Sequence, residues 1–448
     1  MTVQRAEQSN FDGVLDRLRG AIREAEPRRA KGRVRRLLGV VVHATSTDVR
    51  IGELCRLVDP TNERQILAEV VGLCDGYSIL TPIGDLSGLS GMTEVIPTGD
   101  ELRIPVGPGL LGRAISAVGE PLDMPPWPPE GIEAYYPVNA APPRPLDRTL
   151  IDEPIQLGIR SIDGLLTCGR GQRIGVFGEP GVGKSTILAD IARKTDADVV
   201  VVALIGERGR EVREFLDRQL GPRARDKTVF VVATSDRPAV ERVKAAYAAT
   251  TIAEYFRDRG KHVLLLMDSI TRFARAQREI GLAAGEPPTR RGFPPSIFAA
   301  LPRLLERAGP TAGGSITGVY SILVEGDGTL DPVAEEVQAI LDGHLILSPE
   351  LAQRNHFPAV DVLRSRSRLM EAVTPEQHRK DAVRVRELMA RYDEVELLLR
   401  VGEYQKGNDK TADEAVTKID RINAFLRQPS DQNASLRDVA RQLRELAK

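Results

Sequence analysis

The spacing of apolar positions changes along the chain, and each change predicts a different kind of structure. Over residues 1–24 the apolar side chains recur at i, i+3, i+4, i+7 and i+11, the spacing of an amphipathic helix. These residues are Phe11, Val14, Leu15, Leu18 and Ile22. Such a helix either packs on its own protein or docks on a partner, and the pattern alone leaves both possibilities open.

Residues 25–96 contain short apolar runs separated by turn residues such as Asp59-Pro60 and Asp75-Gly76. Short strands between turn signals predict a small antiparallel β-barrel. The expected strands are Val40–Val42, Val49–Ile51, Ile66–Val71 and Ser78–Leu80.

Residues 97–376 are expected to form one α/β domain. From Arg173 to about Leu347 this segment alternates near-continuous apolar runs with helical patterns, which is typical of a mostly parallel sheet covered on both faces. The expected strands are Arg173–Phe177, Val199–Leu204, Val229–Val232, Val263–Met267 and Ile316–Ile322. Residues 377–448 return to helical spacing and predict a helical domain. One of its helices is expected to begin at Ser435, a good N-cap residue with Asp438 three positions later.

Composition narrows the class of protein. A chain of 448 residues is long enough for several domains. A net charge of −1 and an aromatic content of 4% argue against a nucleic-acid partner and against broad attraction to membrane surfaces. The scattered residues Cys55, Cys74 and Cys168 fit a reducing compartment, and no apolar run has signal-peptide or membrane-spanning character. We therefore expect a cytoplasmic protein.

A complete phosphate-binding loop, G-x-x-x-x-G-K-[ST], occupies residues 178–185 between an expected strand and an expected helix. Backbone N–H groups and the helix N-terminus would cradle the phosphates of ATP. Lys184 would reach the β- and γ-phosphates, and the Ser185 hydroxyl would bind Mg²⁺. The predicted nucleotide-binding residues are Gly178, Glu179, Pro180, Gly181, Val182, Gly183, Lys184, Ser185 and Thr186.

Two acidic residues follow expected strands. Asp268 ends an apolar strand and is the second candidate Mg²⁺ group, unless it only caps the following helix. Glu207 follows the Val199–Ile205 strand and is the candidate carboxylate that polarises the attacking water. The adjacent Arg208 is expected to orient Glu207, although a charged solvent loop would have the same composition.

The segment Pro358–Arg368 is rich in arginine. A planar guanidinium stabilises the charge that develops on a transferring phosphoryl group. The segment is too distant in sequence to be assigned to its own phosphate loop, so it serves either a neighbouring subunit or no site at all, as a basic surface turn.

The order of these motifs resembles the catalytic subunits of rotary ATPases, and longer stretches resemble the type III secretion and flagellar export ATPase family more narrowly. The resemblance runs from about residue 30 to residue 428. The stretches are Gly158–Gln172, Asp268–Ile280, Arg291–Phe298, Ile340–His344 and Leu397–Tyr404.

The resemblance implies a RecA-like P-loop core in a homohexamer that binds ATP and Mg²⁺ between subunits. It implies that Lys184, Ser185, Glu207 and Asp268 act in one subunit and that Arg368 is the arginine finger offered to the next, with Arg366 as the alternative. It also implies a stator-like regulatory protein at the N-terminal helix, a central stalk protein, export chaperones with their substrates, and an export gate at the inner face of the cytoplasmic membrane.

The chain departs from that family at Glu179-Pro180, where small residues are usual, and a carboxylate turned towards the phosphates would lower affinity. The alternative functions are a rotary ATP synthase subunit, an RNA-translocating hexamer and a non-catalytic nucleotide-binding subunit. The stretch Val333–Val337 favours the injectisome branch over the flagellar one.

Overall fold

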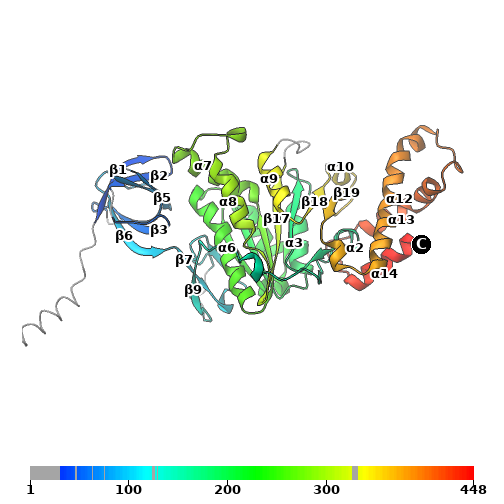
Figure 1. The fold of residues 1–448 in the computed structure, drawn as a ribbon, viewed down its shortest axis with the longest axis horizontal. Helices are drawn as coiled ribbons and strands as arrows, with labels where there is room; N and C mark the ends of the chain where they lie inside the picture. The colour runs from blue at the N-terminus through cyan, green and yellow to red at the C-terminus, as the bar shows by residue number, and fades with distance from the viewer. Residues whose placement is uncertain are drawn as a thin grey trace, which may run out of the picture.

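The computed structural model describes residues 31–45, 48–62, 64–74, 76–123, 127–128, 130–324 and 331–448. Its parts lie in a row, with a β-barrel at one end, an α/β core in the middle and a group of helices at the other end (Figure 1). The predicted partner-docking helix over residues 1–24 lies outside the described residues. No helix in the described ranges combines the length and the apolar character needed to cross a membrane.

The barrel closes in the order β1-β2-β5-β4-β3-β6 with antiparallel neighbours. Its strands are β1 (Gly32–Leu38), β2 (Val41–Thr45), β3 (Glu53–Val58), β4 (Gln65–Cys74), β5 (Tyr77–Ile83) and β6 (Glu94–Glu101). Apolar side chains such as Val42, Leu57 and Leu80 fill its interior. The strand expected at Val49–Ile51 is wrong: the chain turns through Gly52, whose φ of +89° favours glycine, and β3 begins only at Glu53.

The central sheet has the order β19-β18-β12-β17-β15-β13-β14-β8, with β16 (Gly309–Thr311) paired to β17. All neighbours are parallel except β16 with β17 and β19 with β18. The strands are β8 (Ala114–Ser116), β12 (Arg173–Gly178), β13 (Val199–Ile205), β14 (Thr228–Ala233), β15 (His262–Asp268), β17 (Gly314–Leu323), β18 (Gly343–Leu347) and β19 (Val360–Ser367). The short pairs β7 (Arg103–Val106) with β9 (Ala134–Pro137) and β10 (Pro154–Ile155) with β11 (Cys168–Gly169) lie outside this sheet.

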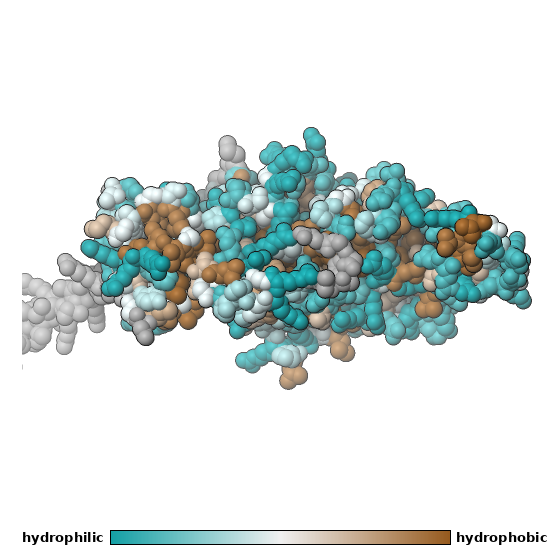
Figure 2. Space-filling model, turned by 90° about the horizontal axis from the view of Figure 1, so that it is seen from above, coloured by the Kyte–Doolittle hydropathy of each residue, from teal (hydrophilic) through white to brown (hydrophobic). Residues whose placement is uncertain are grey.

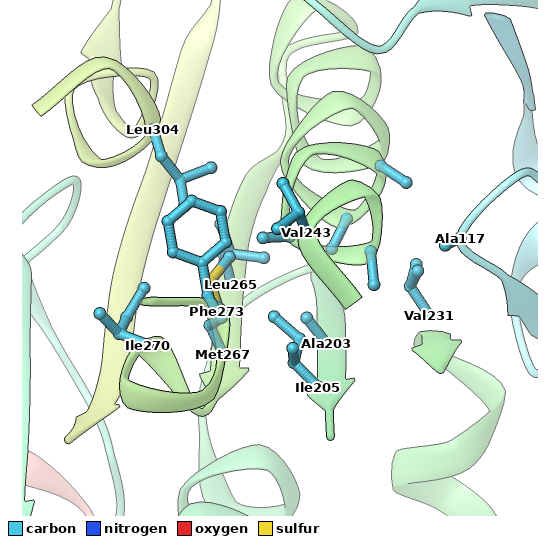
Figure 3. Close-up of a cluster of buried hydrophobic side chains, with 14 of the residues drawn as sticks. Ala117, Ala203, Ile205, Val231, Val243, Leu265, Met267, Ile270, Phe273 and Leu304 are labelled. Carbon is cyan, nitrogen blue, oxygen red and sulfur yellow. The ribbon is translucent and has the colours of Figure 1, made fainter. Parts of the chain in front are cut away.

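Both faces of the sheet are covered, which explains the continuous apolar runs. Alternate residues of β13 enter separate cores, Ala203 and Ile205 on one face and Val202 and Leu204 on the other. Figure 3 shows the first core, where Phe273 and Val243 from the helices lie close to the strand residues Leu265 and Ala203. The helices of this domain are α2 (Arg160–Leu165), α3 (Lys184–Lys194), α4 (Gly209–Glu214), α5 (Pro222–Asp226), α6 (Ala239–Asp258), α7 (Ile270–Ala283), α8 (Pro295–Leu305), α9 (Pro332–Ile340) and α10 (Pro349–Gln353).

The chain ends in helices, as predicted. They are α11 (Met370–Val373), α12 (Glu376–Val401), α13 (Lys410–Leu426) and α14 (Leu436–Ala447). The expected cap of the last helix is confirmed, because the Ser435 side chain accepts a hydrogen bond from the Asp438 N–H. Gly402, with a φ of +77°, ends α12. The predicted fold class, an α/β core between a barrel and a helical domain, is confirmed.

Candidate active site

The phosphate-binding loop joins β12 to α3 at the carboxyl edge of the sheet. Gly181 and Gly183 have φ values of +86° and +94°, which residues with a side chain rarely adopt. Gly183 is the N-cap of α3, and no side chain caps that helix end. The first N–H groups of α3 are therefore available to an anion, and the neighbouring Ser185 and Thr186 are exposed.

Lys184 is folded back onto its own loop. Its side chain is buried, and Nζ donates to the carbonyl oxygens of Gly178 and Glu179, each at 2.6 Å. Burial lowers the pKa of Lys184 to about 8, against the opposing influence of the Asp268 and Glu207 carboxylates. A phosphate in the loop would offer this ammonium a stronger partner than two neutral carbonyls do.

The strand order brings the predicted acidic residues to the same edge as the loop. Strand β15, which ends at Asp268, and strand β13, which precedes Glu207, run parallel to β12. Ser185, Glu207 and Asp268 line one small cavity of about 60 Å³. The alternative in which Asp268 only caps the next helix does not hold, because Ser269 caps α7 by accepting a hydrogen bond from the Arg272 N–H.

Burial dominates the electrostatics of both acids. It raises the pKa of Asp268 above its usual range. Burial, together with the Asp268 carboxylate, raises the pKa of Glu207 to about 8. Two buried carboxylates this close resist simultaneous ionisation unless a cation joins them. Glu207 and Asp268 therefore favour the binding of a cation at this edge of the sheet.

The cation that holds Glu207 is not the expected one. Arg272, from the first turn of α7, forms the ion pair, with Nη2 3.1 Å from Glu207 Oε2. The expectation that Arg208 orients Glu207 is wrong: its side chain is 76% exposed and lies 3.8 Å from Glu211. Arg208 is the N-cap of α4 and extends along that helix towards solvent. Arg272 was recognisable only as a basic residue four positions after Asp268.

Arg368 lies at the opposite edge of the sheet, beside the amino-terminal ends of the parallel strands. Strand β19 is antiparallel to β18, and Ser367 pairs with Gly343, where β18 begins. Since β18 runs parallel to β12, the end of β19 lies far from the carboxyl edge that carries the phosphate loop. Arg366 and Arg368 are both exposed there. The structure thus separates Arg368 from Lys184, Glu207 and Asp268 within one chain.

A larger pocket beside the phosphate loop was not anticipated from the sequence. It has a volume of about 530 Å³, and the aromatic ring of Phe357 forms part of its wall opposite Gly183. The other side comes from the connection between α13 and α14. Its lining includes Val182, Thr186, Leu347, Pro358, Arg427, Gln428 and Pro429. The only signal in the sequence was an aromatic residue just before the arginine-rich segment.

Comparison with known proteins identifies the family. Models of the ATP synthase alpha/beta family match residues 34–99 (beta-barrel domain) and 158–367 (nucleotide-binding domain), and the T3SS EscN ATPase C-terminal domain matches residues 374–445. The Type 3 secretion system ATPase of Sinorhizobium fredii is 52% identical over 429 residues, which are 95% of this chain and 94% of that protein. The chain belongs to the type III secretion ATPase family. It is an ATP-hydrolysing enzyme with a nucleotide-binding core.

Other relatives of this type III secretion ATPase extend the comparison. The Flagellum-specific ATP synthase of Bacillus subtilis is 46% identical and covers 91% of this chain and 93% of its own length. The assembled ATPase EscN of enteropathogenic E. coli superposes with a TM-score of 0.88 at 47% identity, over 93% of this chain and all of that one. EscN in complex with its central stalk EscO gives a TM-score of 0.86 at 46% identity, with the same coverage.

Proposed function

We propose that this ATPase acts as a homohexamer whose Mg²⁺-ATP sites lie between adjacent subunits, and that hydrolysis powers chaperone release, substrate unfolding and export through a type III apparatus. The observation that carries the shared site is the separation of Arg368 from the phosphate loop along the length of the strands, from their amino-terminal to their carboxyl-terminal ends. A second copy of the chain resolves that separation by supplying its own Arg368. The existence of an assembled form of EscN supports association of several copies of the chain.

Within one subunit the loop N–H groups and Lys184 bind the phosphates. Lys184 Nζ exchanges two backbone carbonyls for phosphate oxygens, which stabilises its charged form. Glu207 accepts the proton of the attacking water, and Arg272 holds its carboxylate in place. The neighbour's Arg368 stabilises the charge that develops during transfer.

The chemistry of the small cavity fits Mg²⁺. The Ser185 hydroxyl and the Asp268 carboxylate both line it, and oxygen atoms are the ligands that this ion prefers. Mg²⁺ bound there would neutralise charge on the β- and γ-phosphates. Burial raises the pKa of Asp268, and the positive charges of Arg272 and Lys184 offset part of that rise, so cationic groups already surround this carboxyl group.

The nucleotide base would occupy the pocket beside Phe357. This pocket adjoins the phosphate loop through Val182, Gly183 and Thr186, so a base there stays connected to phosphates in the loop. Its mixture of apolar and aromatic walls suits a purine ring.

Exposed apolar side chains at both ends of the molecule are suited to binding partner proteins. Leu397 and Val401, near the end of α12, are 69% and 59% exposed, and Figure 2 shows apolar surface at this end and over the barrel. We assign the α12 end to a central stalk protein, by analogy with EscN and EscO. The stator-like regulator at residues 1–24, the chaperones, the export gate and the peripheral membrane location stay predictions. The higher identity to the Sinorhizobium protein than to the Bacillus one favours the injectisome branch.

The test is the substitution Glu207→Gln. It keeps the size of the side chain and removes the base, so turnover should fall about a thousandfold or more while nucleotide binding persists. Steady-state ATP hydrolysis and binding of a fluorescent ATP analogue measure the two effects separately. Hydrolysis near the wild-type rate would refute the role of Glu207.

A further inference from the structure

We propose that Gln172 is a positioning residue for Arg368, the arginine that each subunit presents to its neighbour. The inference rests on the proposed function, since it assumes that Arg368 acts in the adjacent site. Gln172 lies immediately before β12, the strand that ends in the phosphate loop. Among the described residues, the hydrogen-bond partners of Gln172 are Gly169, Gly318, Asp342 and Ser367, which are not among the predicted nucleotide-binding residues.

The amide of Gln172 contacts the side chain of Ser367 directly and shares the Asp342 carbonyl with the backbone N–H of Arg368. Its Nε2 donates to the Asp342 carbonyl at 3.0 Å and to Ser367 Oγ at 3.1 Å. The same Asp342 carbonyl accepts a hydrogen bond from the Arg368 N–H at 2.9 Å. Ser367 Oγ in turn donates to the Thr167 carbonyl at 2.9 Å. Both donors of one side chain therefore fix the place where Arg368 leaves the sheet.

The surroundings of this amide leave it little freedom. Gln172 is 0% exposed, and its Oε1 accepts a hydrogen bond from the Gly169 N–H at 2.8 Å. A Cβ at Gly343 would lie 2.7 Å from the Arg366 carbonyl oxygen and 3.3 Å from Gln172 Nε2. The close approach of β18 and β19 thus depends on glycine at position 343. A buried, fully paired amide is costly to displace, so its position is well defined.

The arginine side chain itself is held far less. Arg368 is exposed, and the hydrogen bond that its Nη2 makes within the described residues is long, at 3.5 Å to the Gln338 carbonyl. A rigid backbone anchor combined with a weakly held guanidinium allows an arginine to extend across an interface while its backbone position stays fixed. Arg173, the residue after Gln172, holds Asp342 in place as well, because the Arg173 N–H and Nε each lie 3.1 Å from Asp342 Oδ2.

The anchor and the phosphate loop are therefore the two ends of β12. This strand spans Arg173–Gly178, with the Asp342 contacts at its start and the phosphate-binding loop at its end. In an oligomer, β12 therefore connects the phosphate loop of a subunit to the Arg368 that the same subunit presents to its neighbour.

Two variants test the assignment. Gln172→Met removes both donors at similar volume, and Ser367→Ala is the milder change that leaves the fold intact if Gln172→Met does not. Each should lower kcat about tenfold with KM for ATP within about twofold, because the finger is misplaced while the variant's own phosphate loop is unaffected. Gln156→Met is the matched control, since the half-buried amide of Gln156 donates to the Lys194 carbonyl and none of its described contacts involves Arg368 or Asp342. It should hydrolyse ATP like the wild type.

Mixed assemblies separate positioning from a general structural role. Lys184→Ala subunits cannot bind phosphate but still donate Arg368. When Lys184→Ala subunits are co-expressed with Gln172→Met or Ser367→Ala subunits, the intact Arg368 of the former should restore the activity of each nucleotide site that still has Lys184. In a second experiment, neither Gln172→Met nor Ser367→Ala should lower kcat further when it is added to Arg368→Ala. Wild-type kcat in both variants, or no rescue by Lys184→Ala subunits, would overturn the role of Gln172. Unchanged turnover in Arg368→Ala alone would instead refute the shared site of the proposed function.

Discussion

The two edges of the central sheet carry different kinds of functional residue. At the carboxyl edge, Lys184, Glu207 and Asp268 are each no more than 9% exposed, and burial displaces the pKa of all three. At the opposite edge Arg366 and Arg368 reach into solvent from a firmly bonded backbone. Buried groups with shifted pKa values are typical of a ligand-binding site. An exposed arginine on a rigid backbone is instead suited to contact another protein.

The largest effect that tests this contrast comes from Arg368. The change Arg368→Ala should lower kcat about a thousandfold with nucleotide binding retained, because the guanidinium acts on charge that develops only during transfer. Arg366→Ala is the matched control and should stay within about threefold of wild type. Steady-state hydrolysis at saturating Mg²⁺-ATP measures both. If Arg366→Ala is the more damaging change, the finger is Arg366.

A smaller effect is expected in the pocket beside the phosphate loop. Removing the ring in Phe357→Ala should raise KM for ATP about tenfold with little change in kcat, since stacking on a base contributes equally before and during transfer. Phe357→Tyr keeps the aromatic face and should keep KM near wild type. Initial rates over a range of ATP concentrations give both constants. A fall in kcat at unchanged KM would place the ring outside the base site.

The pH dependence probes the carboxyl edge alone. Glu207 must be ionised to accept a proton, so kcat/KM should rise as pH rises through its pKa of about 8, and it should fall again as Lys184, also near 8, loses its charge. The neighbouring Glu211 raises the pKa of Glu207. Glu211→Gln should therefore move the rising limb to lower pH and leave the falling limb in place. A falling limb that moves equally would refute this assignment.

Local chemistry was readable from the sequence, and contacts between distant segments were not. The phosphate loop and the Ser435 cap depend on residues within a few positions of each other, and both were predicted with their neighbours. Arg272 took the place expected for Arg208 because only the packing of α7 against β13 brings its guanidinium to Glu207. The Phe357 pocket needs a wall from Arg427 and Gln428, some seventy residues later. The predicted domain boundaries and the role of residues 1–24 stay predictions.

The smallest expected effect concerns Glu179, where the loop departs from its family. Its carbonyl accepts from Lys184 Nζ, and its half-buried carboxylate lies near enough to raise the pKa of that lysine slightly against the effect of burial. A negative charge beside the phosphates opposes their binding, but solvent screens it. Glu179→Gln, which removes only the charge, should tighten binding of Mg²⁺-ATP about two- to threefold at low salt. Titration calorimetry at two ionic strengths measures this, and the gain should shrink in high salt. Weaker binding would mean instead that the carboxylate serves the loop by holding Lys184 charged.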